Sequence, residues 1–334
     1  MSVGNTSEAA TVRLSVSEAT SAAERALVSI GFSSEESRVI AAHLVDAALC
    51  GYTFAGLPRI LTIAEDPRTK QPRTPVRIIR ETPVSALVDG GNYVGYYAIH
   101  RAAEIAIEKA NQSRFAIVGV HNCHLSGRNA YYLEMIARAG FVGIHLASAP
   151  PIVVPLGGLR PALGTNPIAF AVPRDPDPYI FDMGTAAIMR GEVILRSRTG
   201  EKLPDGVAID RDGYPTTDPA AALLGGILPF AGHKGYGLSC MIQALCLLTG
   251  AAMPRGRVQD YGFLFVVFDP ELLIPLDEFK QQLETLLGLI KATPRQPGVA
   301  DIRISSERAF AARIKRKKEG IVLERGVFEA INAL

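Results

Sequence analysis

The sequence predicts a mixed α/β fold, and three observations support this prediction. Short, nearly all-apolar runs alternate with segments of helical spacing through the middle of the chain. The apolar runs lack the polar alternation of a half-exposed sheet, which is typical of strands buried on both faces. The chain has 334 residues, 48% hydrophobic and 20% charged, which is ordinary for a globular protein with two domains or one large α/β unit. We therefore expect a mixed central sheet buried on both faces.

The chain begins with two expected helices. Residues 15–18 have the form of a capping box, and the helix that they open is expected to end at Gly31. Residues 33–36 repeat the signal, and the second helix is expected to end near Gly51. A stretch rich in proline and arginine follows at 67–75, and its change in composition predicts a domain boundary.

From residue 76 onward, strands and helices alternate. Strands are expected at 86–88, 115–120, 142–147, 168–172, 179–183 and 263–268. Helices are expected at 96–111, 127–139, 235–249 and 276–291. Two more are expected near the C-terminus, one ending at residue 318 and one ending at residue 334. The polar, glycine-bearing stretch 199–219 is expected to be an extended loop, and loops of this length are usually functional or ordered by a partner.

Charge, cysteines and hydropathy exclude several classes of function. The net charge is only +2, so nothing predicts a nucleic acid or a membrane surface as partner. The four cysteines form no Cys-x-x-Cys pair, which favours a reducing compartment. Residues 1–14 lack the apolar core of a signal peptide, and no apolar run reaches the ~20 residues of a membrane helix, so a cytoplasmic location is expected.

Three segments combine glycines with polar side chains where apolar elements end. Residues 121–129 follow a buried strand and hold two histidines. The two histidines either take part in acid/base chemistry or cofactor contact, or lie in an ordinary surface loop. No third ligand is visible, so no metal is expected. Residues 155–167 form either a ligand-binding loop or ordinary turns. Residues 232–238 open a helix, and Lys234 makes this segment the best candidate for an anion site. A P-loop and a Gly-x-Gly-x-x-Gly fingerprint are absent.

Four motifs together carry a family resemblance. Residues 163–169, 181–183, 215–219 and 233–238 occur in the order seen in the type-2 malate/L-lactate dehydrogenase family, and the similarity runs from about residue 15 to the C-terminus. This family also contains ureidoglycolate, sulfolactate and diketogulonate oxidoreductases and reductases of cyclic imino acids. The chain is identified as a divergent member of it.

The resemblance implies a cytosolic, homodimeric oxidoreductase that uses NAD or NADP and acts on a small carboxylate substrate. It implies a non-Rossmann fold, with a helical domain from both chain ends (1–75 and 285–334) and a sheet domain that binds the nucleotide (76–284). The residues that it places on the cofactor are Phe181, Asp182, Met183, Gly184, Thr185, His233, Lys234, Gly235, Ser305, Ser306 and Glu307.

The substrate residues depart from the family pattern. Where the family has Arg-Gly-x-x-Ser-His-Gly-x-x-Arg, residues 50–59 keep both glycines and the final Arg59, but Phe54-Ala55 replaces the Ser-His pair. The expected substrate contacts are Phe54, Arg59, Thr165 and Asn166, with Arg59 holding a carboxylate.

A second departure concerns the proton donor. The family's histidine lies two residues before a glycine, and Leu125 occupies that position. His124, one residue earlier, is the preferred catalytic residue beside Arg59; His121, Tyr52 and water are the alternatives.

These departures bear on the substrate. A protonated cyclic imine is already a cation, so its reduction needs less acid assistance than the reduction of a ketone. The sequence therefore favours reduction of a cyclic imino acid (pyrroline- or piperideine-2-carboxylate type) or of a 2-oxo acid, by hydride transfer from NAD(P)H. The alternative is a catalytically weakened nucleotide-binding protein with a sensing or scaffold role.

Overall fold

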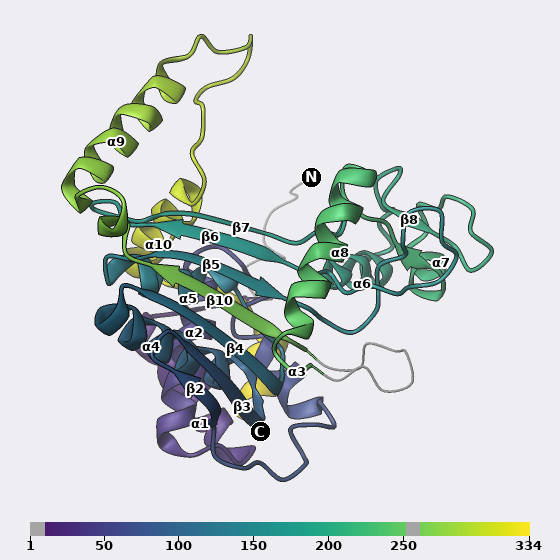
Figure 1. Ribbon diagram of the computed structural model, residues 1–334. Coiled ribbons are helices and arrows are strands. Elements are labelled where there is room, and N and C mark those ends of the chain that lie inside the picture. Colours follow the sequence, from purple (N-terminus) through teal and green to yellow (C-terminus); the bar gives the residue numbers. More distant parts are fainter. Residues whose placement is uncertain (1–10, 252–260) are drawn as a thin grey trace.

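A computed structural model describes residues 11–251 and 261–334. Its centre is a seven-stranded mixed sheet in the order β2-β3-β4-β10-β5-β6-β7 (Figure 1). Only β3 and β4 pair in parallel; every other neighbouring pair in this sheet is antiparallel. The strands are β2 (Arg77–Thr82), β3 (Ser85–Val94), β4 (Phe115–His124), β5 (Val142–Ala147), β6 (Ile168–Val172), β7 (Tyr179–Met183) and β10 (Phe263–Phe268). The expected mixed α/β fold is confirmed.

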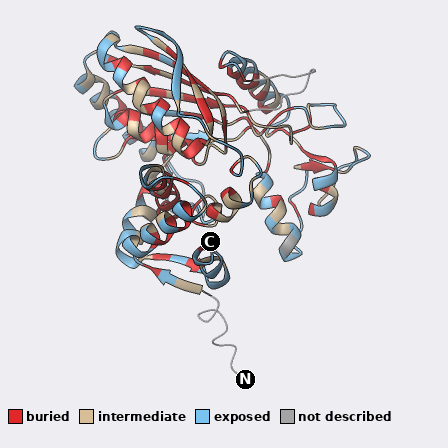
Figure 2. Ribbon diagram, turned by 90° about the horizontal axis from the view of Figure 1, so that it is seen from below, coloured by how far each residue is buried: buried red, intermediate tan, exposed pale blue. Residues whose placement is uncertain are grey.

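Both faces of the sheet carry helices, because side chains of a strand alternate between its faces. Phe263 and Phe265 of β10 belong to the main core with α4 (Gly95–Ser113) and α5 (Asn129–Arg138). Leu264, between them, packs instead with Ile242 of α8 (His233–Leu247) on the opposite face. Figure 2 shows buried residues along the strands and the inner sides of the covering helices.

The two chain ends share a second core. It contains α1 (Val16–Ser29), α2 (Ser34–Leu49), α3 (Arg59–Glu65) and α11 (Arg325–Asn332), packed around Leu27, Leu44 and Ile60. A two-stranded sheet, β1 (Thr11–Leu14) with β11 (Ile321–Glu324), joins the ends directly. Ser15 and Ser33 form the capping boxes expected from the sequence.

Two further parts lie at the borders of the sheet (Figure 1). A small unit with its own apolar cluster contains α6 (Arg190–Thr199), β8 (Ala208–Ile209), α7 (Pro219–Leu224) and β9 (Gly226–Ile227). At the other side, α9 (Leu276–Ala292) projects, with Leu283 and Leu287 packed on the β6–β7 end. A short 3-10 turn (Pro270–Leu272) precedes α9, and α10 (Glu307–Glu319) follows it.

The structure changes one expected element and adds several. His121 and His124 were expected in a loop, but β4 continues through His124 because Tyr93 and Val94 of β3 pair with Cys123 and His124. The expected domain boundary at 284/285 falls within α9, and the division into two domains stays a prediction. No helix in the described parts of the chain is long and apolar enough to cross a bilayer. Residues 1–10, part of the segment judged to lack a signal peptide, lie outside the described residues.

Candidate functional site

The end of β7 is where several expected site segments meet. The carboxylate of Asp182 accepts a hydrogen bond at 2.9 Å from the N–H of Ala130, in the first turn of α5. A carboxylate at a helix N-terminus is favoured by the helix dipole and satisfies an otherwise unpaired N–H. Asp182 therefore joins β7 to the segment that follows β4.

Neighbouring residues of β7 face opposite sides of the sheet. Met183 packs toward Leu238 of α8, on the side opposite the α5 contact of Asp182. Phe181 is paired with Phe170 and is exposed. Because of this alternation, the side chains of Phe181 and Asp182 lie on opposite faces of the sheet, and the contact of both residues with the cofactor stays a prediction.

The C-terminal candidate segment also reaches β7. Ser306 donates from Oγ to the carbonyl of Ile180 at 2.5 Å, on the strand that carries Asp182. Glu307 begins α10, accepts a hydrogen bond from the N–H of Ile304 at 3.1 Å and forms a 2.8 Å ion pair with Lys291. The structure thus brings the segments 181–185 and 305–307 together, as a shared ligand site requires.

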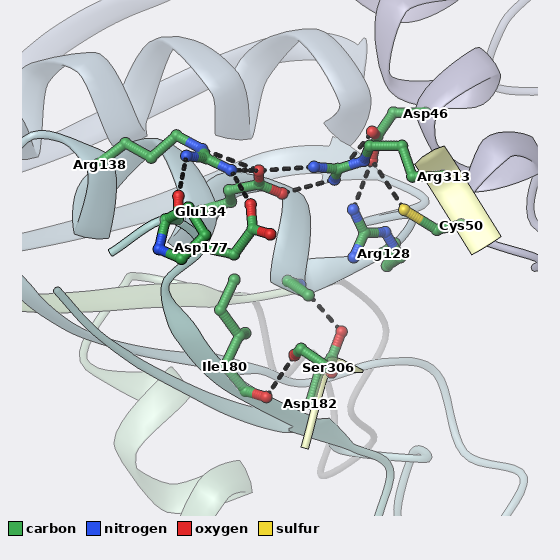
Figure 3. A network of polar contacts seen from close by, with 12 residues as sticks. Asp46, Cys50, Arg128, Glu134, Arg138, Asp177, Ile180, Asp182, Ser306 and Arg313 are labelled. Atoms are coloured by element: carbon green, nitrogen blue, oxygen red, sulfur yellow. Dashed lines mark hydrogen bonds and ion pairs between the residues drawn. The ribbon is translucent and has the colours of Figure 1, made fainter. Parts of the chain in front are cut away.

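A buried ionic network holds α10 in this position (Figure 3). Arg313 of α10 donates to both carboxylate oxygens of Glu134 on α5, at 2.7 and 2.6 Å, and reaches Asp46 of α2 at 2.9 Å. Arg128 pairs with the same Asp46, and Arg138 pairs with Glu134. Burial raises the pKa of Glu134, but the hydrogen bonds and charges of Arg313 and Arg138 outweigh it, so this pKa lies below its usual value.

A second polar cluster fastens the segment 165–166 beneath α8. Nδ2 of the fully buried Asn166 donates to the carbonyl and hydroxyl oxygens of Ser239 and to Oε1 of Gln243, at 3.0 to 3.2 Å. Thr185 donates from Oγ1 to the carbonyls of Thr165 and Asn166, at 3.0 and 3.1 Å. The structure therefore gives Asn166 and Thr185 a packing role beside the site.

The N-terminus of α8 has the features of a phosphate site. Its N-cap is Gly232, no side chain caps the first turn, and His233 and Lys234 are exposed. The backbone enters the helix tightly, since a Cβ at Gly235 would lie 2.0 Å from the carbonyl oxygen of Phe230. Uncapped N–H groups, the positive helix end and the Lys234 ammonium together fit the pyrophosphate of a dinucleotide. The N–H of Phe230 bonds to the carbonyl of Thr185 at 3.0 Å, which links this turn to the end of β7.

The expected carboxylate site lies at the start of α3. Arg59 is half-buried, its Cζ lies 4.4 Å from the ring centroid of Phe54, and its guanidinium makes no hydrogen bond or ion pair among the described residues. Its donors are thus available to a ligand. Gly191 was not expected at the site, yet its α-carbon faces the same ring: a Cβ there would lie 2.4 Å from Cε1 of Phe54. In the sequence Gly191 stands out only as a glycine between two charged residues, which does not indicate this contact.

The three side chains expected as sources of a proton differ in their surroundings. His124 is only 1% exposed at the end of β4, and Leu125 packs against the helical core. His121 is tied through Nδ1 to the carbonyl of Thr249 at 2.8 Å. Tyr52 is exposed between the guanidinium groups of Arg128 and Arg308, 5.8 and 5.3 Å from its ring centroid. His124 is thus buried, whereas Tyr52 is exposed to solvent.

A further histidine, His43, fixes the backbone of the segment that follows β4. Nε2 of His43 accepts a hydrogen bond at 2.9 Å from the backbone N–H of Arg128, and the ring packs among Tyr96, Tyr131 and Tyr132. Burial, together with the charge of Arg128, holds the pKa of His43 well below its usual value. The ring is thus neutral and fixes the segment that follows β4. No group of three His, Cys, Asp or Glu residues suited to a metal ion occurs within 11–251 and 261–334.

Comparison with known proteins identifies the family. Residues 14–332 match the family model of malate/L-lactate dehydrogenase. The chain is 34% identical over 328 residues to malate/(S)-sulfolactate dehydrogenase of Methanothermus fervidus, covering 93% of this chain and 95% of the relative. It is 32% identical to Δ1-pyrroline-2-carboxylate reductase of Pseudomonas fluorescens, covering 97% and 98%. A solved structure of a putative malate/lactate dehydrogenase from Escherichia coli superposes with a TM-score of 0.88 at 30% identity, covering 96% and 93%. The chain belongs to the malate/L-lactate dehydrogenase family and is a dehydrogenase.

Proposed function

We propose that this dehydrogenase uses NADH or NADPH to reduce a small cyclic 2-imino acid whose carboxylate is held by Arg59. The observation that carries the proposal is the pair formed by Arg59 and Phe54: a half-buried guanidinium that makes no hydrogen bond or ion pair within the described residues and is covered on one face by an aromatic ring. A guanidinium presents parallel N–H groups in its own plane, so the uncovered edge of Arg59 suits a carboxylate.

The cofactor segments support nucleotide use. The nicotinamide, when bound, supplies the hydride that forms the new C–H bond at the substrate carbon. The exposed N–H groups and Lys234 at the start of α8 would hold its pyrophosphate. Asp182 ties the end of β7 to α5, Ser306 bonds to Ile180 of the same strand, and the N–H of Phe230 ties Thr185, just after β7, to the turn that opens α8.

The proton balance favours an imine over a ketone. Hydride addition to a protonated imine breaks the C=N π bond and leaves a neutral secondary amine, so no protein proton is consumed. Hydride addition to a 2-oxo acid leaves an alkoxide, which needs a proton donor close to the oxygen. Phe54 and Ala55 supply no proton and His124 is buried, which leaves His121, Tyr52 and water as donors and favours the imine, which needs none from the protein. The curated pyrroline-2-carboxylate reductase among the relatives is consistent with this choice.

The test compares matched substrates with both coenzymes. Purified enzyme is assayed by absorbance at 340 nm with pyrroline-2-carboxylate, piperideine-2-carboxylate, pyruvate, oxaloacetate and 2-oxoglutarate. We expect kcat/KM for an imine to exceed that for every oxo acid, and Arg59→Ala to lower it at least about tenfold. Efficient turnover of an oxo acid, lost in His124→Ala, would overturn the choice of imine.

We also propose that the enzyme is a homodimer. The outer side of α8 exposes Met241, Leu245 and Leu248, and the neighbouring sheet face exposes Ile117 and Phe170. Exposed apolar surface of this kind usually belongs to a protein contact. Light scattering should give twice the 35.7 kDa chain mass, and Leu248→Glu should shift the protein toward the monomer. A wild-type monomer at micromolar concentration would overturn this proposal.

A further inference from the structure

The loop before α3 touches the small unit of α6 through the aromatic ring of Phe54. Phe54 is 46% exposed, yet the edge of its ring lies on the backbone of Gly191, in the first turn of α6. A Cβ at Gly191 would lie 2.4, 2.8 and 2.9 Å from Cε1, Cζ and Cδ1 of Phe54. Real Cβ atoms do not approach carbon so closely, so the ring holds this place only while residue 191 is glycine.

The same ring fixes the guanidinium of Arg59. The face of Phe54 lies under Cζ of Arg59 at 4.4 Å, which is a cation–π contact. No hydrogen bond or ion pair from the described parts of the chain orients this guanidinium, so the ring is its specific contact. A long arginine side chain without such a contact samples several rotamers, and ordering it reduces binding.

We propose that Phe54 is a positioning residue. The α6 backbone at Gly191 fixes the place of its ring, and the ring in turn fixes the substrate-binding guanidinium of Arg59. This inference rests on the proposed role of Arg59 in binding a carboxylate. The unit of α6 and α7 would thereby set substrate affinity through one ring contact. The exposed part of the Phe54 ring would also border the bound substrate with an apolar surface, which suits a hydrocarbon ring and disfavours a second acid group.

The first test needs no turnover. The Nε–H signal of Arg59, assigned by its loss in Arg59→Lys, should show an upfield ring-current shift in a 15N–1H spectrum. Phe54→Leu and Gly191→Ala should each abolish this shift. Gly191→Ala raises the helix propensity of α6, so loss of the helix cannot explain its effect. Gly288→Ala is the matched control, because Gly288 lies in α9 with nothing within 4 Å of its Cβ position.

The second test is a double-mutant cycle on KM. With the best substrate from the panel, Phe54→Ala and Gly191→Ala should each raise KM about three- to tenfold, with kcat changed less than twofold and coenzyme affinity unchanged. The double variant should equal Phe54→Ala alone, because the added methyl group has no ring to displace. Phe54→Tyr, which keeps the ring face, should restore the wild-type KM.

The outcomes separate the two proposals. An Arg59 signal unchanged by Gly191→Ala, or KM effects that multiply in the double variant, would overturn the positioning role. Loss of the ring-current shift in both variants, in an enzyme that binds neither nicotinamide nucleotide, would support the ring contact and overturn the proposed function instead.

Discussion

Replacing Arg313 by methionine tests the network that holds α10. The change removes two hydrogen bonds to Glu134, at 2.7 and 2.6 Å, and the ion pair with Asp46 at 2.9 Å. The side chains of Arg313, Glu134 and Asp46 are 13%, 11% and 16% exposed, so water replaces the lost contacts poorly. Breaking a buried pair costs about 3–5 kcal/mol.

Two remaining partners reduce this cost. Glu134 keeps Arg138, and Asp46 keeps Arg128, so neither carboxylate is left without a cation. We therefore expect the free energy of unfolding to fall by about 3 kcal/mol, at the lower end of that range. Adding Glu134→Leu to Arg313→Met should recover at least about 1 kcal/mol, because the buried carboxylate is then gone.

Urea unfolding followed by fluorescence and circular dichroism measures the free energy of unfolding of the single and the double variant. Arg316→Met is the comparison, since Arg316 of α10 bonds only to the carbonyl of Ala48 among the described residues and should cost less. Because Ser306 and Glu307 precede the network on α10, Arg313→Met should also weaken coenzyme binding. A loss below about 1 kcal/mol for Arg313→Met would refute the account of a desolvated network.

Three other outcomes follow from the structure. Asn166→Ala should lower the free energy of unfolding by about 2 kcal/mol, measured by urea, because Ser239 and Gln243 lose a buried donor; an unchanged stability with a raised KM would assign Asn166 to substrate binding instead. Lys234→Met should raise the coenzyme Kd about tenfold at low salt, measured by quenching of protein fluorescence, whereas Lys318→Met should leave it unchanged. Burial lowers the pKa of His145 from 6.5 to about 3, so the unfolded chain takes up the proton first and stability should fall below pH 6.5 by about 1.4 kcal/mol per pH unit. His145→Leu should reduce that slope in pH-dependent urea titrations, and an unchanged slope would contradict the burial of a neutral ring.

The sequence predicted those elements that are stabilised by residues close to one another in the chain. The capping boxes at Ser15 and Ser33 marked two helix starts correctly, because the hydrogen bonds that define them join residues three apart. The apolar run of β10 was equally clear, since four of its six residues are buried and they lie on both faces of the sheet. Elements that depend on distant partners were missed. β1 and β11 are four residues each and form only because the chain ends pair.

The site shows the same division. The sequence indicated a helix N-terminus at the glycines and Lys234, and α8 does begin there without a side-chain cap, because a helix start is a local feature; its use as an anion site stays a prediction. The end of β4 was misjudged, since polar residues resembled a loop and only pairing with β3 keeps them in a strand. The contact of Phe54 with Gly191 joins residues 137 positions apart, and no periodicity or spacing in the chain could indicate it.

The most direct test of the central claim is NADH and NADPH oxidation at 340 nm by the purified wild-type protein with the imine and oxo-acid panel. We expect substrate-dependent loss of absorbance with at least one coenzyme, fastest with a cyclic imine carboxylate. Binding of a nicotinamide nucleotide without turnover of any substrate would favour a sensing or scaffold role. Failure to bind either nucleotide would contradict the account as a whole.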